Sequence, residues 1–446
     1  MNPLVIVVIG VIVSLVALVH WYLWRRLVRD TTTPGSRTRR VLTVVLIALP
    51  VTTFAGLATE RAGANFTLQR VLAWPGMLWL ATLLYLSLAL FAGELVRPLL
   101  RRFLERRAAR RAADEAVTGA VADPGREAAV AALAQKVAVG DREGAAGSGG
   151  GLLPDEPDAP APESAAPEPA DLSRRLFVAR TVAVGATAAA VGTVGYGAYG
   201  VLGRAPKVKR VTVPLAKLPR AAHGYRIAVV SDIHLGPVLG RHHTERIVAT
   251  INRTNPDLIA VVGDLVDGTV EHLGPAAEPL RGLRARDGSF FVTGNHEYFS
   301  GAAEWVDHVR ELGIHPLENA RTELAGFDLA GVNDVAGEDE GDGPDFEKAL
   351  GDRDTSRAVV LMAHQPVVIH DAVDHGVDLQ LSGHTHGGQL WPGNYVAALA
   401  NPTVAGLERY GDTQLYVTRG AGAWGPPVRV GAESDITVVE LASRQA

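Results

Sequence analysis

The stretch "YRIAVVSDIHLG", residues 225–236, decides the fold of the carboxy-terminal part of this chain. Its apolar run, Ile227 to Val230, leads through one serine into Asp232 and His234. Short apolar runs without alternation are typical of strands that are buried on both faces of a sheet. The stretch therefore predicts a buried strand that ends in a carboxylate and an imidazole.

Four further stretches repeat this pattern of a short apolar run that ends in a polar side chain: "PDLIAVVGD" (256–264), "GSFFVTGN" (288–295), "RAVVLMAH" (357–364) and "VDLQLSGH" (377–384). Helical stretches such as 244–253 and 302–312 lie between them. Strands that alternate with helices predict an α/β sandwich over residues 205–446. Because functional groups in such sheets collect at strand ends, we expect these polar side chains to meet at one edge.

The side chains at these strand ends are all possible metal ligands. The chain has no cysteine, so a metal must be held by nitrogen and oxygen donors, which here suit Mn, Fe or Zn better than Ca or Mg. Seven donors, one of them a carboxylate that can bridge, fit two divalent metal ions better than one. The seven candidates are Asp232, His234, Asp264, Asn295, His364, His384 and His386.

The chemistry that such a site predicts is the hydrolysis of a phosphoester bond. Two metal ions about 3.5 to 4 Å apart can hold both the attacking and the leaving oxygen, with a metal-activated water as nucleophile. His296 follows Asn295 and is not needed as a ligand. It would protonate the leaving oxygen or stabilise the transition state.

The motifs around Asp232, Asp264, Asn295, His364 and His384 resemble, in this order, the calcineurin-like metallophosphoesterase superfamily. Residues 387–389 and "TRGAGAWGPPVRVG" (418–431) are similar to its membrane-associated bacterial branch. The resemblance covers roughly residues 225–441 and implies a four-layer α/β/β/α sandwich. It also implies one metal ion held by Asp232, His234, Asp264 and His386, and a second held by Asp264, Asn295, His364 and His384.

Other residues near these motifs are open to two interpretations. Asp267, where members that act on phosphoproteins usually carry an arginine, either orients a ligand imidazole or is a turn residue. His243, with its neighbour His242, either touches substrate or starts a helix. Arg429, like Arg419, either binds a phosphate or forms a surface ion pair. Three aromatic residues either form an apolar wall for a lipid chain or only pack: Trp391, Tyr395 and Trp424.

Four apolar segments precede or border the globular part. Three predicted transmembrane helices occupy residues 1–100, at 4–24, 41–58 and 71–95. Residues 101–172 are basic and then rich in Ala, Pro and Glu, which predicts a disordered cytoplasmic linker. Residues 173–204 predict a fourth transmembrane helix, whose start at 173–178 resembles a twin-arginine export motif and suggests the export machinery as a partner.

Arginine-rich segments flank these helices at 25–40 and 97–111, and the positive-inside rule assigns both to the cytoplasm. The catalytic domain then lies outside the cytoplasm, on a multi-pass protein of the cell membrane. The net charge of -5 gives no sign of a nucleic-acid partner.

The sequence thus predicts a membrane-anchored phosphoesterase that acts on phosphodiester or pyrophosphate bonds of lipid-linked or cell-envelope substrates. Two alternatives stay open. One is a phosphomonoesterase of broad specificity, and the other is a metal-binding envelope sensor without catalysis.

Overall fold

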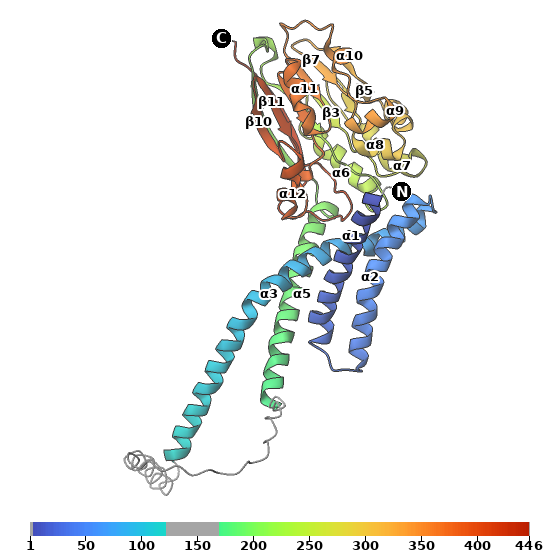
Figure 1. Cartoon of the computed structure of the whole chain (residues 1–446). Helices are drawn as coiled ribbons and strands as arrows, with labels where there is room; N and C mark the ends of the chain where they lie inside the picture. Colours follow the sequence, from blue (N-terminus) through green and yellow to red (C-terminus); the bar gives the residue numbers. More distant parts are fainter. Residues whose placement is uncertain (1–2, 122–168, 446) are drawn as a thin grey trace, which may run out of the picture. The chain divides into compact units, whose positions relative to one another are not determined.

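The computed structural model describes residues 3–121 and 169–445 (Figure 1). These residues form two compact units. The first comprises the described residues of Met1–Leu42 and Ser87–Thr187, and the second comprises those of Thr43–Leu86 and Ala188–Ala446. Three long helices, at Arg37–Arg61, Phe66–Val121 and Pro169–Leu202, contribute to both units.

Apolar helices make up the amino-terminal part of the chain. They are α1 (Pro3–Leu23), which continues as a π-helical turn η1 (Trp24–Arg29), α2 (Arg37–Arg61), α3 (Phe66–Val121) and α5 (Pro169–Leu202). Within the described ranges, four helical segments are long and apolar enough to cross a membrane: Gly10–Arg29, Arg37–Thr59, Phe66–Glu115 and Arg174–Leu202. They overlap the four segments that the sequence predicts.

The structure differs from the sequence prediction at the start of the linker. Helix α3 continues to Val121, so residues 101–121 are helical. This stretch is rich in Ala and Arg, which are strong helix formers. Residues 122–168 of the predicted linker lie outside the described residues. The twin-arginine-like residues 173–178 lie inside α5, and their export role stays a prediction.

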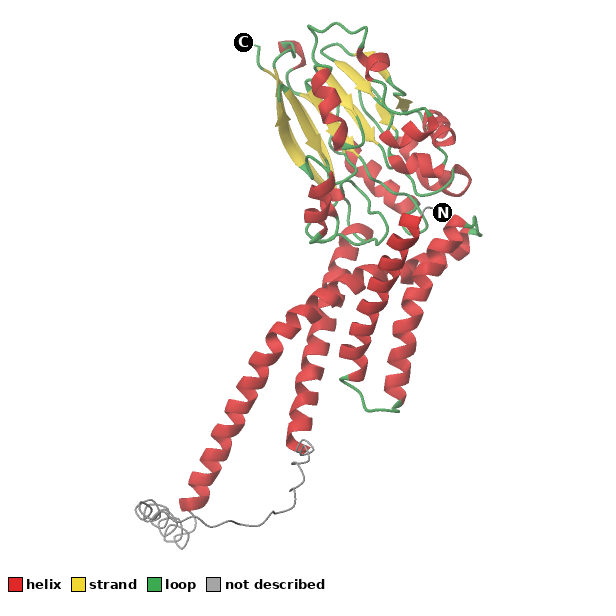
Figure 2. Ribbon diagram, viewed as in Figure 1, coloured by secondary structure: helices red, strands yellow, loops and turns green. Residues whose placement is uncertain are grey.

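Two six-stranded mixed sheets form the globular part of the second unit (Figure 2). In the first, ordered β1-β12-β2-β3-β4-β5, only the β12–β2 pair is antiparallel. Its strands are β1 (Lys207–Leu215), β2 (Tyr225–Val230), β3 (Leu258–Val262), β4 (Ser289–Val292), β5 (His315–Pro316) and β12 (Asp435–Ser443).

The second sheet, ordered β10-β11-β9-β8-β7-β6, is parallel in its centre and antiparallel at both edges. Its strands are β6 (Ala320–Glu323), β7 (Asp328–Gly331), β8 (Val359–Met362), β9 (Leu379–Ser382), β10 (Gly406–Tyr410) and β11 (Thr413–Val417).

Helices cover the outer face of each sheet. Apolar residues of α6 (Arg241–Asn252), α7 (Val270–Ala277) and α9 (Ala302–Glu311) pack on the first sheet, and those of α10 (Phe346–Leu350) and α11 (Ile369–Asp374) pack on the second. A third buried cluster fills the space between the two sheets. The predicted four-layer α/β/β/α sandwich is confirmed. Two more helices, α8 (Asn295–Ser300) and α12 (Gly393–Ala400), lie in loops.

Strand β2 shows why its sequence is apolar without interruption. Ile227 and Val229 point into the core between the sheets, whereas Ala228 and Val230 point into the core under the helices. Successive side chains of a strand face opposite sides, so both sides need apolar residues here.

The five motif-bearing strands do not belong to a single sheet edge. β2, β3 and β4 lie in the first sheet, and β8 and β9 lie in the second. The two sheets pack face to face, which brings the carboxyl ends of both strand sets to one end of the sandwich. The polar side chains at the strand ends therefore meet between the two sheets and not at the edge of one sheet.

Candidate functional site

Each of the seven candidate ligands follows a strand end directly. Asp232 and His234 come after β2, Asp264 after β3, and Asn295 after β4, while the second sheet contributes His364 after β8 and His384 and His386 after β9. The structure brings all seven together. Two acid–imidazole groups form: Asp232 with His234 and His386, and Asp264 with His364 and His384.

The backbone at these positions is strained. Asp232, His234, Asp264, His384 and His386 all have φ between 51° and 70°, in the left-handed region that non-glycine residues rarely adopt. Five of the eight such residues in the described part of the chain are therefore at this site. Strain of about 1 to 3 kcal/mol per residue persists only where the surroundings impose it, and it is concentrated at functional sites.

Hydrogen bonds between neighbouring loops hold this backbone. The Asp232 carboxylate accepts from the backbone N–H of His384, at 3.0 Å to Oδ1 and 3.2 Å to Oδ2. The backbone N–H of His234 donates to the carbonyl of Asp264 at 3.1 Å. Strand ends from both sheets are thereby tied into one rigid site.

In the first group, two ring nitrogens and a carboxylate oxygen lie close together. His234 Nε2 lies 3.0 Å from His386 Nε2, and His386 Nε2 lies 3.3 Å from Asp232 Oδ1. The other ring nitrogen of His234, Nδ1, lies 2.9 Å from Asp267 Oδ1. Since that carboxylate only accepts, Nδ1 carries a proton and Nε2 faces into the group. Burial would lower the pKa of His234, but the carboxylates of Asp267, Asp264 and Asp232 outweigh it and raise that pKa to about 9.

The second group is built in the same way. His364 Nε2 lies 3.1 Å from Asp264 Oδ2 and has no hydrogen-bond partner of good geometry, while its Nδ1 donates to the Val262 carbonyl at 2.8 Å. His384 Nδ1 lies 3.0 Å from Asn295 Oδ1. Asp264 Oδ2 is also 3.7 Å from His234 Nε2, so this carboxylate faces an imidazole of each group.

Burial and charge together favour cations here. Burial alone would lower the pKa of His364, but the carboxylates of Asp264 and Asp232 outweigh it and raise that pKa well above its usual value. Burial and the charge of Asp264 raise the pKa of Asp232. Burial and the charge of His364 lower the pKa of His384 to about 4, which leaves this ring neutral and able to bind a metal.

These ring nitrogens and carboxylates are buried and face one another, an arrangement that a divalent cation between them would stabilise. The residues present therefore fit divalent metal ions. Their grouping divides in the same way as the two ligand sets that the family resemblance implies.

A third group links the metal-facing rings to the site entrance. Asp267 Oδ1 lies 2.9 Å from His234 Nδ1 and 2.7 Å from His296 Nδ1. Although burial opposes it, the charges of His234 and His296 lower the pKa of Asp267. Of the two interpretations of Asp267, this geometry favours the orientation of imidazole rings over a plain turn residue.

His296 lies at the rim of the site, with its side chain 14% exposed. Its backbone N–H donates to Asp264 Oδ1 at 2.9 Å, which fixes it beside the second group. Burial would lower the pKa of His296, but the hydrogen bond to Asp267 outweighs it and raises that pKa. Phe299 and Trp424 flank the ring edge-on, each 5.6 Å away between centroids.

Two of the substrate candidates are buried. The guanidinium of Arg429 donates to the carbonyls of Gly422, His386 and Ala432, and Nη2 lies 3.1 Å from His386 Nδ1. This fully engaged side chain supports the His386 loop and is not a surface ion pair. His243 is 3% exposed, and burial and Arg246 lower its pKa to about 3. A contact of either residue with substrate is not favoured by these positions.

Glu297 is a site residue for which sequence reasoning assigned no role. Its buried carboxylate accepts from the backbone N–H groups of Asp264, Leu265 and Gly294, at 2.7 to 2.9 Å. Gly294 itself lies so close to Asp264 that a Cβ at this position would overlap it. The only signal in the sequence was an acidic residue next to the Asn295-His296 pair.

A family model for the calcineurin-like phosphoesterases matches residues 225–388. An uncharacterized metallophosphoesterase of Helicobacter pylori is 36% identical over 272 residues, which cover 60% of this chain and 72% of that protein. The chain belongs to the calcineurin-like phosphoesterase family.

Two other family members differ in how much of their length they share with this calcineurin-like protein. YkuE of Bacillus subtilis, also an uncharacterized metallophosphoesterase, is 31% identical over 52% of this chain and 84% of its own length. A zebrafish transmembrane protein with a metallophosphoesterase domain is 40% identical over 259 residues, but the chain covers only 59% of it.

Proposed function

We propose that this chain is a membrane-anchored phosphoesterase with a dinuclear metal site, which hydrolyses phosphodiester or pyrophosphate bonds. The observation that supports it best is the convergence of the His234, His364 and His386 Nε2 atoms with the carboxylates of Asp232 and Asp264. Two divalent ions held there, Mn, Fe or Zn, would polarise the phosphoryl group and lower the pKa of a water molecule that attacks it.

The protein's own residues would complete the reaction. The Nδ1–H group of His296 donates a hydrogen bond to Asp267, which stabilises the protonated ring, and Nε2–H of that ring can then give its proton to the leaving oxygen. Asp267 keeps this ring and the His234 ring in fixed orientations. Phe299 and Trp424 contact this ring edge-on and limit its movement.

Removal of divalent metal by EDTA is expected to abolish hydrolysis of bis-p-nitrophenyl phosphate by the purified full-length protein. Addition of Mn²⁺, Fe²⁺ or Zn²⁺ restores it, and the restoring ion identifies the cofactor. Metal removal should also lower the unfolding temperature, because a ligand at 100 times its Kd stabilises the folded state by about 2.7 kcal/mol. Turnover is followed by absorbance and unfolding by differential scanning fluorimetry.

The same experiment separates the alternatives. A metal-dependent shift in unfolding temperature without any turnover would favour the sensor. Faster turnover of p-nitrophenyl phosphate than of the diester would favour the phosphomonoesterase. Turnover that survives chelation would contradict the metal-dependent mechanism.

The surface beside the site supports a lipid-linked substrate. Helix α12 exposes Tyr395, Val396 and Leu399 by 66, 69 and 88%. The helix packs tightly against the metal-site loop, because a Cβ on Gly388 would overlap Asn394. Trp391 and Trp424, both at least half exposed, extend this apolar surface. Apolar side chains this exposed are typical of surfaces that contact protein or membrane.

Contacts within the second unit connect this surface to membrane helices. The hydroxyl of Tyr85, on α3, donates to the Trp391 carbonyl at 2.9 Å. The backbone N–H of Arg429 donates to the carbonyl of Gly197, on α5, at 3.3 Å. Both helices are candidate membrane spans. We therefore propose that the apolar surface touches the bilayer and that substrates with acyl chains reach the site from the lipid.

Substitution of both Val396 and Leu399 by Asp is expected to lower the hydrolysis of a lipid-anchored p-nitrophenyl phosphodiester in phosphatidylcholine vesicles by about ten-fold or more, because two exposed apolar side chains no longer enter the lipid. Hydrolysis of the soluble diester stays unchanged. The matched control is Leu407→Asp on β10, another exposed leucine. Equal losses on both substrates would contradict the lipid-contact proposal.

The arrangement of the first unit supports a catalytic domain outside the cytoplasm. Arg26 pairs with Glu94 of α3 at 2.9 Å, and Arg180 of α5 donates to the Thr31 carbonyl at 3.1 Å. The arginine-rich segment after α1 therefore contacts both α3 and α5, as a shared cytoplasmic location of the arginine-rich segments requires. With four crossings, the chain after residue 205 is then on the other side.

A reporter fused after Ala446 tests this topology. We expect an alkaline phosphatase fusion, which is active only outside the cytoplasm, to be active and a green fluorescent protein fusion to be dark. The reverse pair of results would move the catalytic domain to the cytoplasm.

A further inference from the structure

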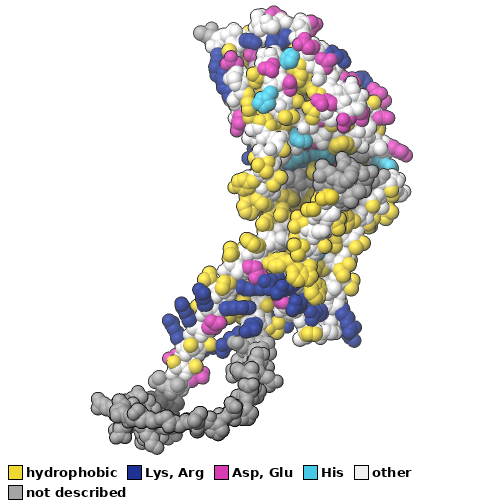
Figure 3. Space-filling model, in the orientation of Figure 1, with side chains coloured by type: hydrophobic (Ala, Val, Ile, Leu, Met, Phe, Trp, Pro, Cys, Tyr) yellow, Lys and Arg dark blue, Asp and Glu magenta, His cyan; other side chains and the backbone are white. Residues whose placement is uncertain are grey.

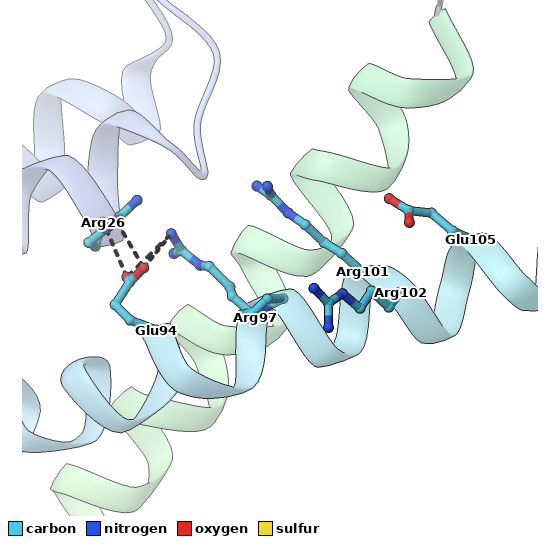
Figure 4. A pocket seen from close by; sticks show the side chains of 7 residues that line it. Arg26, Glu94, Arg97, Arg101, Arg102 and Glu105 are labelled. Atoms are coloured by element: carbon cyan, nitrogen blue, oxygen red, sulfur yellow. Dashed lines mark hydrogen bonds and ion pairs between the residues drawn. The ribbon is translucent and has the colours of Figure 1, made fainter.

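An open cavity of about 540 Å³ lies at the surface of the first unit, between η1 and α3. It is lined chiefly by charged residues, with Arg26 from η1 and Glu94, Arg97, Arg101, Arg102 and Glu105 from α3 (Figure 4). Residues 94, 97, 101 and 105 are three or four positions apart, so they share one face of α3. Figure 3 shows Lys and Arg side chains gathered on these helices beside apolar surface.

The cavity has more positive than negative charge. Its four guanidinium groups face two carboxylates, and Glu94 is shared by Arg26 at 2.9 Å and Arg97 at 3.3 Å. Among the described residues, Arg101 and Arg102 form no ion pair. An excess of two positive charges therefore remains for an anion.

Arg97 indicates where such an anion would bind. The residue is only 8% exposed, and its Nε and Nη2 have no hydrogen-bond partner in the described part of the chain. Arginines near the end of a membrane helix usually extend their charge to water, whereas this guanidinium is packed inside the unit. Unpaired buried N–H groups are costly, and a phosphate can accept two parallel bonds from one guanidinium.

Apolar side chains next to the cavity distinguish a lipid from a soluble anion. Phe91, Leu95, Leu99 and Phe103 follow at four-residue spacing along α3, and each is exposed by 58 to 67%. A phosphate held by the arginines would place attached acyl chains along this stripe. We propose that the cavity is a binding site for the phosphate group of an anionic membrane lipid, separate from the catalytic site.

Native mass spectrometry of the full-length protein in detergent tests this site with two probes, phosphatidylglycerol and phosphatidylcholine. We expect one tightly bound phosphatidylglycerol and weaker binding of phosphatidylcholine. Arg97→Gln and Arg101→Gln each weaken phosphatidylglycerol binding about ten-fold, through loss of a charge-assisted hydrogen bond. The matched control, Arg110→Gln, changes an exposed arginine of the same helix outside the cavity and leaves binding unchanged.

The remaining outcomes decide against the proposal in distinct ways. Equal binding of the two lipids, or an equal loss in Arg110→Gln, would mean only general attraction between arginines and anionic lipid. Displacement of bound phosphatidylglycerol by millimolar inorganic phosphate would assign the cavity to a soluble anion. A lower unfolding temperature of Arg97→Gln with unchanged lipid preference in both cavity variants would show that Arg97 only holds Glu94.

Discussion

Replacement of Asp264 by Asn is expected to lower turnover of bis-p-nitrophenyl phosphate by about 10³-fold or more. Asp264 Oδ2 faces His364 Nε2 at 3.1 Å and His234 Nε2 at 3.7 Å, so its charge serves both proposed metal ions. The amide keeps the shape of the side chain but removes the negative charge between the two imidazoles. Metal content, measured by inductively coupled plasma mass spectrometry, should fall with the activity.

Asp374→Asn is the matched control for this variant. Asp374 is exposed on α11 of the same sandwich and has the same chemistry without contact to the ligand groups. Its metal content and turnover should equal those of the unchanged protein. An Asp264→Asn protein that keeps both metal ions and full turnover would rule out the bridging role.

His296→Gln is expected to lower turnover of an alkyl phosphodiester by about 10²- to 10⁴-fold. The metal content should stay the same, because a general acid donates a proton and provides no ligand atom. The loss should depend on the leaving group. It should be large for an alkyl phosphodiester, whose departing alkoxide needs a proton, and small for a p-nitrophenyl ester, whose phenolate leaves without one. Initial rates on the two substrates measure this difference.

His242→Gln provides the control for His296, since this ring is 91% exposed and pairs only with Glu245 among its charged neighbours. Equal losses of the His296 variant on both substrates would contradict proton donation. Because Asp267 contacts both His296 and His234, a loss of metal in the variant would instead indicate that His296 acts by positioning Asp267.

Much of the sandwich could be predicted from local pattern. Buried central strands such as β2 and β3 consist of uninterrupted apolar residues, because both of their faces lie in a core. Strand β12 could not be placed in the same way. Its insertion between β1 and β2, antiparallel to β2, depends on pairing across more than two hundred residues, which no local pattern records.

The same contrast between local sequence pattern and tertiary contacts applies to the candidate site. The candidate ligands were recognisable because polar side chains at the ends of apolar strands form a pattern in the sequence itself. The residues that hold the candidate ligands in place have no such signal in the sequence. Glu297 holds three backbone N–H groups of the ligand loops, and Arg429 holds the carbonyls around His386, and both act through contacts made only in the folded chain.

The sequence by itself determined the class of fold, the seven candidate ligands and the four apolar segments, because each depends on residue type and short spacing. Tertiary structure alone decided that the candidate ligands come from two sheets packed face to face, that Asp267 joins His234 to His296, and that Arg97 is buried beside an arginine-lined cavity. The physical reason is distance along the chain. Contacts between residues far apart in sequence form only when the layers pack, and burial then sets which polar atoms remain without partners.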